Sequence, residues 1–222
     1  MAITRVGEAE ADGNDDEDLT LDLSIISLLE NDIVVIMAYG GTSAPAMTTG
    51  GYDETTFGLG LLAWKRMGAS PDSSAVVDIT GAVGLYASAA VAVAFRGVDA
   101  TTAMDATITS ATGSSTNPDS PSITTVTDGA AVISAFGSSV DDFTVTAPSG
   151  YGDQVNNAEI DTFSAAVGMA WLTKATAGAE NPAAWTDVSD ASWSAFTVAL
   201  RPVTAPPAYN AKGRLAILGA RP

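Results

Sequence analysis

The stretch that decides the fold is VAVAFRGV, from Val91 to Val98, because its pattern returns later in the chain as FTVALRPV, from Phe196 to Val203. In each stretch an apolar run ends on one arginine, which is followed by Gly or Pro and then by Val. Both runs have the length and the β-branched or aromatic content of a strand. One pattern written twice predicts an internal duplication.

The alternation inside the two runs predicts which side chains share a face, because successive residues of a strand point to opposite sides. Large residues alternate on one face of each copy: Val91, Val93 and Phe95 in the first, and Phe196, Val198 and Leu200 in the second. The opposite face of the first copy carries Ala90, Ala92 and Ala94, which are small enough for a neighbouring segment to approach closely.

An arginine ends each copy, Arg96 in the first and Arg201 in the second. An anionic ligand is one interpretation of such a pair. Because the two residues end equivalent strands, a structural role is expected instead, with hydrogen bonds to carboxylates or to strand-end carbonyls. Asp99 and Asp190 are candidate partners.

The same order of elements surrounds both copies. A turn, at Asn31–Asp32 and again at Asp128–Gly129, precedes an apolar strand, a Gly-Tyr loop, a Trp-containing strand, a proline turn, a short strand and the arginine-ended strand. In the first half, residues 42–56 are predicted as loop and residues 57–67 as one long strand. Trp64 and Trp171 occupy matching positions, so we expect both to pack in the core or against a sheet.

The composition agrees with an all-β fold. Of the 222 residues 46% are hydrophobic, largely Ala and Val, whereas only three are Lys and seven are Glu. No convincing helix separates the strands, which excludes the crossovers of a parallel sheet. We predict a two-sheet antiparallel β-sandwich. One duplicated unit is expected to be too small to cover its own hydrophobic face, so two units pack face to face or interlock as the Greek keys of a jelly roll.

Absent residue types exclude several kinds of chemistry. The chain has no Cys and no His, so disulfides, thiolate or imidazole metal sites and histidine-based catalytic triads are ruled out. A net charge of −17 argues against binding to nucleic acid or to anionic membranes. No apolar run is long enough to span a membrane, and the first thirty residues do not resemble a secretory leader.

Charge divides the chain into three predicted parts. Residues 1–18 hold seven carboxylates between Glu8 and Asp18 and are expected to form a solvated acidic segment. Residues 19–203 are predicted to form the sandwich, and residues 204–222 an extended arm beginning with a stiff proline connector. The residues of this arm predicted to dock on a neighbouring molecule are Tyr209, Lys212, Arg214, Leu215, Ile217 and Leu218.

Two acidic patterns are candidates for a metal site or a catalytic site. Asp12, Asn14, Asp16 and Asp18 have the spacing of a calcium loop, but Glu17 and Leu23 stand where that loop requires Gly and a bidentate Glu. Glu159 and Asp161 would share a strand face as a glycosidase pair, but Phe163 takes the place of a third acid, and Asp141–Asp142 reads as loop. We therefore expect no metal, no other cofactor and no catalysis.

Two loop tyrosines are candidate ligand residues. Tyr52 and Tyr151 both follow a glycine and lie near acidic residues, where an aromatic ring can stack on a sugar. The alternative is a tyrosine whose ring holds its loop while its hydroxyl reaches water.

Several segments resemble a family of small β proteins of phages and prophages. They are DIVVIMAY, ASAAVAVAFRGVDATTAMDA, PSITTVTDGAAVISAFG, PSGY and WSAFTVALRPV, within about residues 20–203. The resemblance implies a lectin-type jelly roll (concanavalin A-like) in a tail, fibre or head-decoration protein, but supplies no catalytic or ligand motif. It implies a non-enzymatic virion structural protein that forms a homo-oligomer and contacts other capsid or tail proteins. The alternatives are a carbohydrate-binding module for host adhesion and, with less support, a glycoside hydrolase.

Overall fold

Antiparallel strands make up nearly all of the computed structural model, which describes residues 2–14, 18–40, 43–79, 86–139, 143–160, 164–188 and 191–203. The first half contains β1 (Thr4–Asn14), β2 (Leu19–Asp22), the short 3-10 helix η1 (Leu23–Ile25), β3 (Ile33–Gly40), β4 (Ala46–Met47), β5 (Asp53–Phe57), β6 (Gly60–Arg66), β7 (Ser74–Asp78) and β8 (Ala87–Arg96). The second half contains β9 (Thr109–Ser115), β10 (Ile123–Thr125), β11 (Ala130–Ser138), β12 (Phe143–Thr146), β13 (Gly152–Glu159), β14 (Ala165–Lys174), β15 (Gly178–Glu180), β16 (Thr186–Val188) and β17 (Ala191–Leu200).

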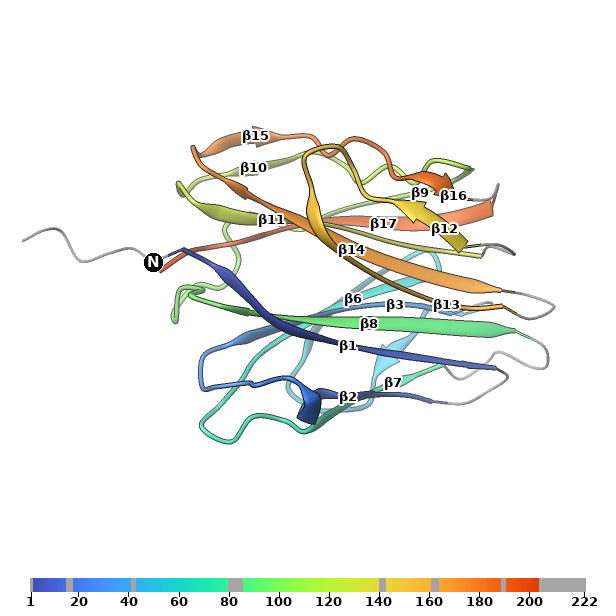
Figure 1. Cartoon of the computed structure of the whole chain (residues 1–222), viewed down its shortest axis with the longest axis horizontal. Coiled ribbons are helices and arrows are strands. Elements are labelled where there is room, and N and C mark those ends of the chain that lie inside the picture. The colour runs from blue at the N-terminus through green and yellow to red at the C-terminus, as the bar shows by residue number, and fades with distance from the viewer. Residues whose placement is uncertain are drawn as a thin grey trace, which may run out of the picture.

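Two five-stranded sheets form the centre of the molecule. Their strand orders are β1-β8-β3-β6-β5 and β9-β17-β11-β14-β13, so each position in one sheet has a counterpart from the other half of the chain. The sheets lie face to face, with β1 and β8 against β13 and β14, and β6 and β5 against β17 and β9. The predicted all-β sandwich and the predicted duplication are both confirmed at this level (Figure 1).

The pairing registers show the duplication residue by residue. Across the first sheet, Val93, Val35 and Trp64 lie side by side on β8, β3 and β6. Across the second, Val198, Ile133 and Trp171 lie side by side on β17, β11 and β14. The two tryptophans therefore occupy the same position in the two halves.

A smaller layer covers the outer face of each large sheet (Figure 1). In the first half it is the sheet β2-β7-β4, and in the second half it is the two ribbons β10-β15 and β12-β16. From β1 to β4 the chain alternates between the large and the small sheet, which is the winding of a jelly roll. The expectation that one unit could not cover its own hydrophobic face was therefore wrong in part. Each unit covers its outer face and leaves only its inner face to the other unit.

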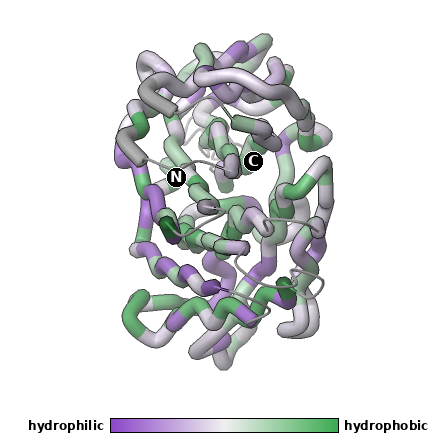
Figure 2. Tube along the Cα trace, turned by 90° about the vertical axis from the view of Figure 1, so that its right-hand side faces the viewer, coloured by the Kyte–Doolittle hydropathy of each residue, from purple (hydrophilic) through white to green (hydrophobic). Residues whose placement is uncertain are grey.

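Three clusters of buried side chains fill the spaces between the four layers. The inner cluster, between the large sheets, contains all six large residues that alternation assigned to it. Ala90, Ala92 and Ala94 lie in the cluster beneath β2-β7-β4, where their small side chains allow that layer to approach closely. A third cluster lies beneath the two ribbons of the second half. Figure 2 shows the hydrophobic segments gathered toward the middle of the molecule.

Two predicted boundaries in the first half are corrected. Residues 4–14 are not a separate acidic segment, because they form β1 and pair with β8. Gly7, Ala9 and their same-face neighbours are small and pack toward the covering layer, and the acidic side chains between them discourage pairing with another chain at this edge. The strand predicted over residues 57–67 begins only at Gly60, as β6, because Gly58 has a φ of +61° and turns the chain; residues 53–57, mostly predicted as loop, form β5 and pair with β6.

A methyl group added at Gly137 should destabilise the contact between the large sheets. A Cβ at this position of β11 would lie 2.6 Å from the Cβ of Tyr39 on the facing β3. We expect Gly137→Ala to lower the free energy of unfolding by about 1–3 kcal/mol, the usual effect of overpacking, in urea denaturation. Gly152→Ala is the control, because nothing lies within 4 Å of its Cβ position. Equal stability of the two variants would contradict face-to-face packing.

Candidate functional site

One end of the sandwich carries every basic residue of the described part of the chain. These residues are Arg5, Lys65, Arg66, Arg96, Lys174 and Arg201, and each lies at or next to the end of its strand. The connection between the two halves crosses this end, and Val203, the last described residue, donates its N–H to the carbonyl of Gly97 here. Residues 204–222 therefore continue from this end.

Both strand-ending arginines form ion pairs, with carboxylates that the sequence did not single out. Arg96 donates from Nε and Nη2 to the two carboxylate oxygens of Asp32, at 2.9 and 2.7 Å. Arg201 donates from Nε to Asp105 Oδ1 at 3.2 Å. Asp99 was the candidate within the described residues and instead caps its own loop, while Asp190 lies outside them. The predicted structural role of both arginines is confirmed.

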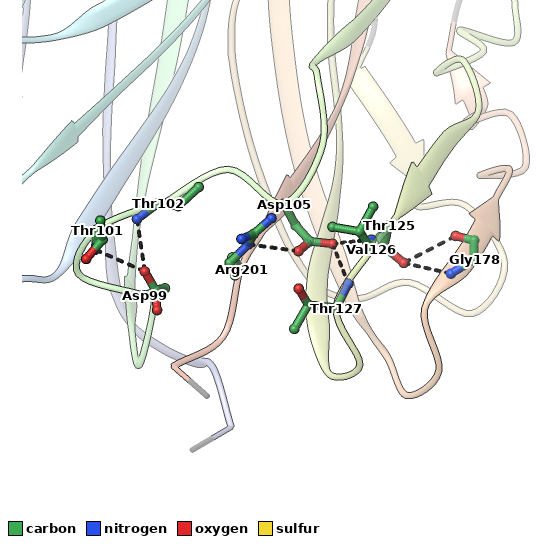
Figure 3. Close-up of polar contacts among 9 residues, drawn as sticks. All are labelled: Asp99, Thr101, Thr102, Asp105, Thr125, Val126, Thr127, Gly178 and Arg201. Atoms are coloured by element: carbon green, nitrogen blue, oxygen red, sulfur yellow. Dashed lines mark hydrogen bonds and ion pairs between the residues drawn. The ribbon is translucent and has the colours of Figure 1, made fainter. Parts of the chain in front are cut away.

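The carboxylates of Asp99 and Asp105 hold the inter-half connection in place (Figure 3). Asp99 accepts from the backbone N–H groups of Thr101 and Thr102, and these bonds hold its pKa below the usual value. Asp105 is buried and accepts from the N–H groups of Val126 and Thr127, at 2.7 and 3.1 Å, as well as from Arg201. Burial alone would raise the pKa of Asp105, but the hydrogen bonds and the arginine outweigh it and lower the pKa.

A groove runs between this connection and the edge of the first large sheet. It consists of two adjoining hollows of about 480 and 360 Å³, both lined by Trp64 and Met104. The larger hollow is also lined by Thr55, Asp105, Thr107 and Ile108, and the smaller by Ile33, Asp53, Arg66 and Thr101. We call the two hollows together the Trp64 groove. Its volume falls in the range of small-ligand sites.

The local strand geometry places the polar groups of the groove around the indole of Trp64. Asp53 lies directly across from Trp64 on the edge strand β5, and paired residues of two strands project to the same face. Thr55 and Arg66 follow Asp53 and Trp64 at a spacing of two, so they share this face as well. A half-buried aromatic ring is thus bordered by a carboxylate, a hydroxyl and a guanidinium.

Three of these groups are open to a ligand. Asp53 is exposed and makes no ion pair within the described part of the chain. Arg66 uses one N–H of each terminal nitrogen on the carbonyls of Asn31 and Asp99, so only its remaining N–H groups can serve a ligand, and it meets no carboxylate among the residues described. Trp185 and Trp193 donate their indole N–H groups to serine hydroxyls, whereas no such acceptor meets Trp64 in the described structure.

The equivalent tryptophan in the other half, Trp171, is also half-buried, but two side chains cover its ring. The guanidinium of Arg5 lies over the ring of Trp171, 5.4 Å from its centroid, and Phe95 meets the same ring edge to face at 5.2 Å. Arg5 is opposite Phe95 on β8, and Met104 occupies the matching place opposite Leu200 on β17. Trp171 of the second half is thus covered by a cation from β1 of the first half, whereas Trp64 is bordered by the thioether of Met104 and adjoins a groove.

The tyrosines proposed from the sequence as sugar-stacking residues lie under the small covering layers, away from the Trp64 groove. Tyr52 is half-buried, with the Nζ of Lys65 5.2 Å from its ring centroid. Tyr151 is only 8% exposed and packs in the third cluster, with its hydroxyl 3.5 Å from Glu180. Burial, followed by the nearby Asp72 or Glu180, raises the pKa of both phenols. Each ring packs in a core cluster, as the alternative interpretation expects, but the hydroxyl of Tyr52 is buried rather than in water and that of Tyr151 meets Glu180.

The acidic candidates are not brought together in the described structure. Glu159 accepts from the side-chain amide of Asn14 at 2.9 Å, and Asp161, its proposed catalytic partner, lies outside the described residues, as do Asp141 and Asp142. Asp16 of the calcium-loop pattern lies outside them too. Within the described ranges no three acidic residues gather closely enough to hold a metal ion.

The six docking residues of the predicted arm, from Tyr209 to Leu218, also lie outside the described residues. No helix in the described ranges is long and apolar enough to cross a membrane.

The groove combines a flat apolar surface with hydrogen-bonding groups of both charge signs and has the chemistry of a binding site. Sequence reasoning placed Trp64 correctly in a strand but not in a site, because its twin Trp171 has the same local pattern. One feature of the sequence could have indicated the site: Asp53 and Thr55 are polar, although the strand that pairs with them, β6, is apolar. Comparison of the chain with protein-family models, with curated proteins and with solved structures finds no match in any of the three.

Proposed function

We propose that this chain is a structural protein of a bacteriophage virion, an exposed and non-catalytic β-sandwich on the capsid or tail. In this proposal it forms a homo-oligomer and contacts other virion proteins. The resemblance of residues 20–203 to small phage and prophage β proteins motivates the proposal. Its main structural support is the uneven distribution of charge: the basic residues of the described part of the chain all lie at one end of the molecule.

This end has the properties expected of an assembly surface. Leu29, Val126 and Val203 are large apolar residues that are 56%, 65% and 37% exposed, and hydrogen bonds place all three here. Residues 204–222 continue from the same end and carry three more basic residues. Apolar contacts supply association energy, and charge fixes which acidic neighbour is chosen. The remaining acidic surface would then face the medium and keep particles apart by repulsion.

Deletion of residues 205–222 should leave a folded protein that no longer assembles. The described sandwich makes its hydrogen bonds and core contacts without these residues, so thermal unfolding should change little. Oligomer mass by light scattering and incorporation into purified particles should both fall to the background of an unrelated acidic protein. The control is the full-length chain carrying Gly152→Ala, a change outside the arm that meets no neighbouring atom.

Electron microscopy of intact particles carrying a label on this protein tests the location itself. A label at regular positions on the capsid or the tail is the expected result. Particles that carry none of this protein, or a truncated chain that still assembles, would contradict the proposal.

A further inference from the structure

We propose that the Trp64 groove binds a saccharide, with the indole of Trp64 as the platform and Asp53 and Arg66 as the groups that recognise ring hydroxyls. This binding activity goes beyond the structural role proposed above and does not depend on it. It is carried by the contrast between the open Trp64 and its sealed counterpart Trp171, together with the polar groups that border the open one.

The platform suits a ring that is apolar on its faces and polar at its edge. Trp64 is half-buried at the rim of the inner cluster, so its position is held by packing while part of the ring borders the groove. Met104, from the inter-half connection, adds a polarizable apolar surface beside it. The C–H face of a pyranose covers such a surface and removes it from water.

The side chains that border the groove supply both hydrogen-bond donors and hydrogen-bond acceptors. Asp53 offers only acceptors and Arg66 only donors, while the hydroxyls of Thr55, Thr101 and Thr107 offer both. A carboxylate and a guanidinium can each engage two neighbouring hydroxyls in one plane. Asp105 is not available to a ligand, because its oxygens already accept from two backbone N–H groups and Arg201.

Other ligand classes fit this border less well. A lipid or an apolar peptide would remove Asp53 and Arg66 from water without giving them partners, which is costly. An anion would be repelled by the carboxylate of Asp53, and a cation would be repelled by the guanidinium of Arg66. A neutral molecule with many hydroxyls satisfies both residues, and the two hollows of about 480 and 360 Å³ have room for a short oligosaccharide rather than a long chain.

The sealed site in the other half explains why one groove is expected rather than two. Arg5 occupies the space over Trp171 that a sugar ring would need, and Phe95 fixes the ring from the side. The duplication thus allows a direct comparison of two matching tryptophans: Trp171 is covered by other side chains, whereas Trp64 borders a groove.

A glycan array carrying bacterial surface oligosaccharides identifies the ligand, and NMR of the four indole N–H groups locates its site. On titration with an oligosaccharide that binds the array, the indole signal of Trp64 should shift, whereas those of the buried Trp185 and Trp193 should stay. Trp64→Ala should weaken binding by about tenfold or more, as expected for a central aromatic contact.

A second variant keeps the test independent of folding. Asp53 is exposed, so Asp53→Ala should leave the unfolding temperature unchanged and still weaken binding about tenfold. Tyr52→Phe and Tyr151→Phe are the matched controls and should bind as the parent protein does.

Three results would overturn the proposal. They are an array without any bound glycan, binding that survives both Trp64→Ala and Asp53→Ala, and a shift of the Trp64 indole signal when residues 205–222 are removed. The last result would mean that the chain's own arm occupies the groove. The first two results leave particle assembly untouched, which the truncation and microscopy test separately.

Discussion

Trp185→Ala is expected to lower the free energy of unfolding by about 3–5 kcal/mol, the range for removing a large aromatic side chain from a core. Trp185 is fully buried in the third cluster and packs against Phe136, with 4.8 Å between the ring centroids. Its indole N–H also donates to the hydroxyl of Ser134 at 2.9 Å. The covering ribbons of the second half are too small to collapse into the space it would leave.

Trp185 lies where the covering layer of the second half differs from that of the first. In the first half one strand, β7, pairs with both β2 and β4. In the second half two separate strands take its place: β15 pairs with β10, and β16 pairs with β12. Residues 181–185 separate these two strands, and the side chain of the last of them, Trp185, is buried in the third cluster. We infer that the split strand is stable because Trp185 fills the cluster beneath it.

Urea unfolding followed by circular dichroism measures the effect. Trp185→Phe is the graded variant, because it keeps most of the buried ring and should retain most of the stability. Ile160→Ala is the control for a large apolar residue that is 57% exposed, and it should change little. A loss below about 1 kcal/mol for Trp185→Ala would show that the covering layer does not depend on this contact.

Asp105→Asn should lower the free energy of unfolding by about 3 kcal/mol, near the lower end of the range for breaking a buried ion pair. The amide keeps the shape of the side chain but replaces one acceptor oxygen with a donor. That donor would face the N–H groups of Val126 and Thr127 or the guanidinium of Arg201. Arg201 keeps some access to water, which reduces the loss.

The same carboxylate predicts how stability depends on pH. The pKa of Asp105 is lower in the folded protein than in the unfolded chain, so the folded state favours its charged form. Its contribution is present above the usual pKa of an aspartate and is lost as the pH falls through the lowered value. We therefore expect the parent protein to lose stability below about pH 4 more steeply than Asp105→Asn does.

Asp99→Asn is the matched control for both measurements. Asp99 lies in the same connection and also accepts from backbone N–H groups, but it is only half-buried and forms no ion pair within the described residues. Its replacement should change stability little. If Asp99→Asn and Asp105→Asn proved equally mild, the connection between the halves would not be held by the buried carboxylate.

Much of the inner cluster could be predicted because its signal is local. A strand alternates its side chains with a period of two, so the order of Val91, Val93 and Phe95 assigned them to one face without any knowledge of their partners. The twin tryptophans were matched for the same reason. Repetition of the pattern in the second half then predicted two related sheets.

The partners of the charged groups could not be predicted in the same way. Arg96 and Arg201 stand at equivalent positions, but their carboxylates come from different elements. Asp32 precedes β3, whereas the matching position in the second half is Ala130, the first residue of β11; there Asp105 from the inter-half connection supplies the carboxylate. Spacing along the chain does not reveal which distant segment crosses a strand end.

The sequence alone therefore determined that this protein is all-β, that it is duplicated and which strand faces are buried, because each follows from periodicity within one short segment. Only the tertiary structure decided that β1 joins the sheet, that each half covers its own outer face and that Trp64 is open while Trp171 is sealed. These outcomes depend on contacts between segments far apart in the chain. Such contacts are set by the packing of whole layers, which no local pattern specifies.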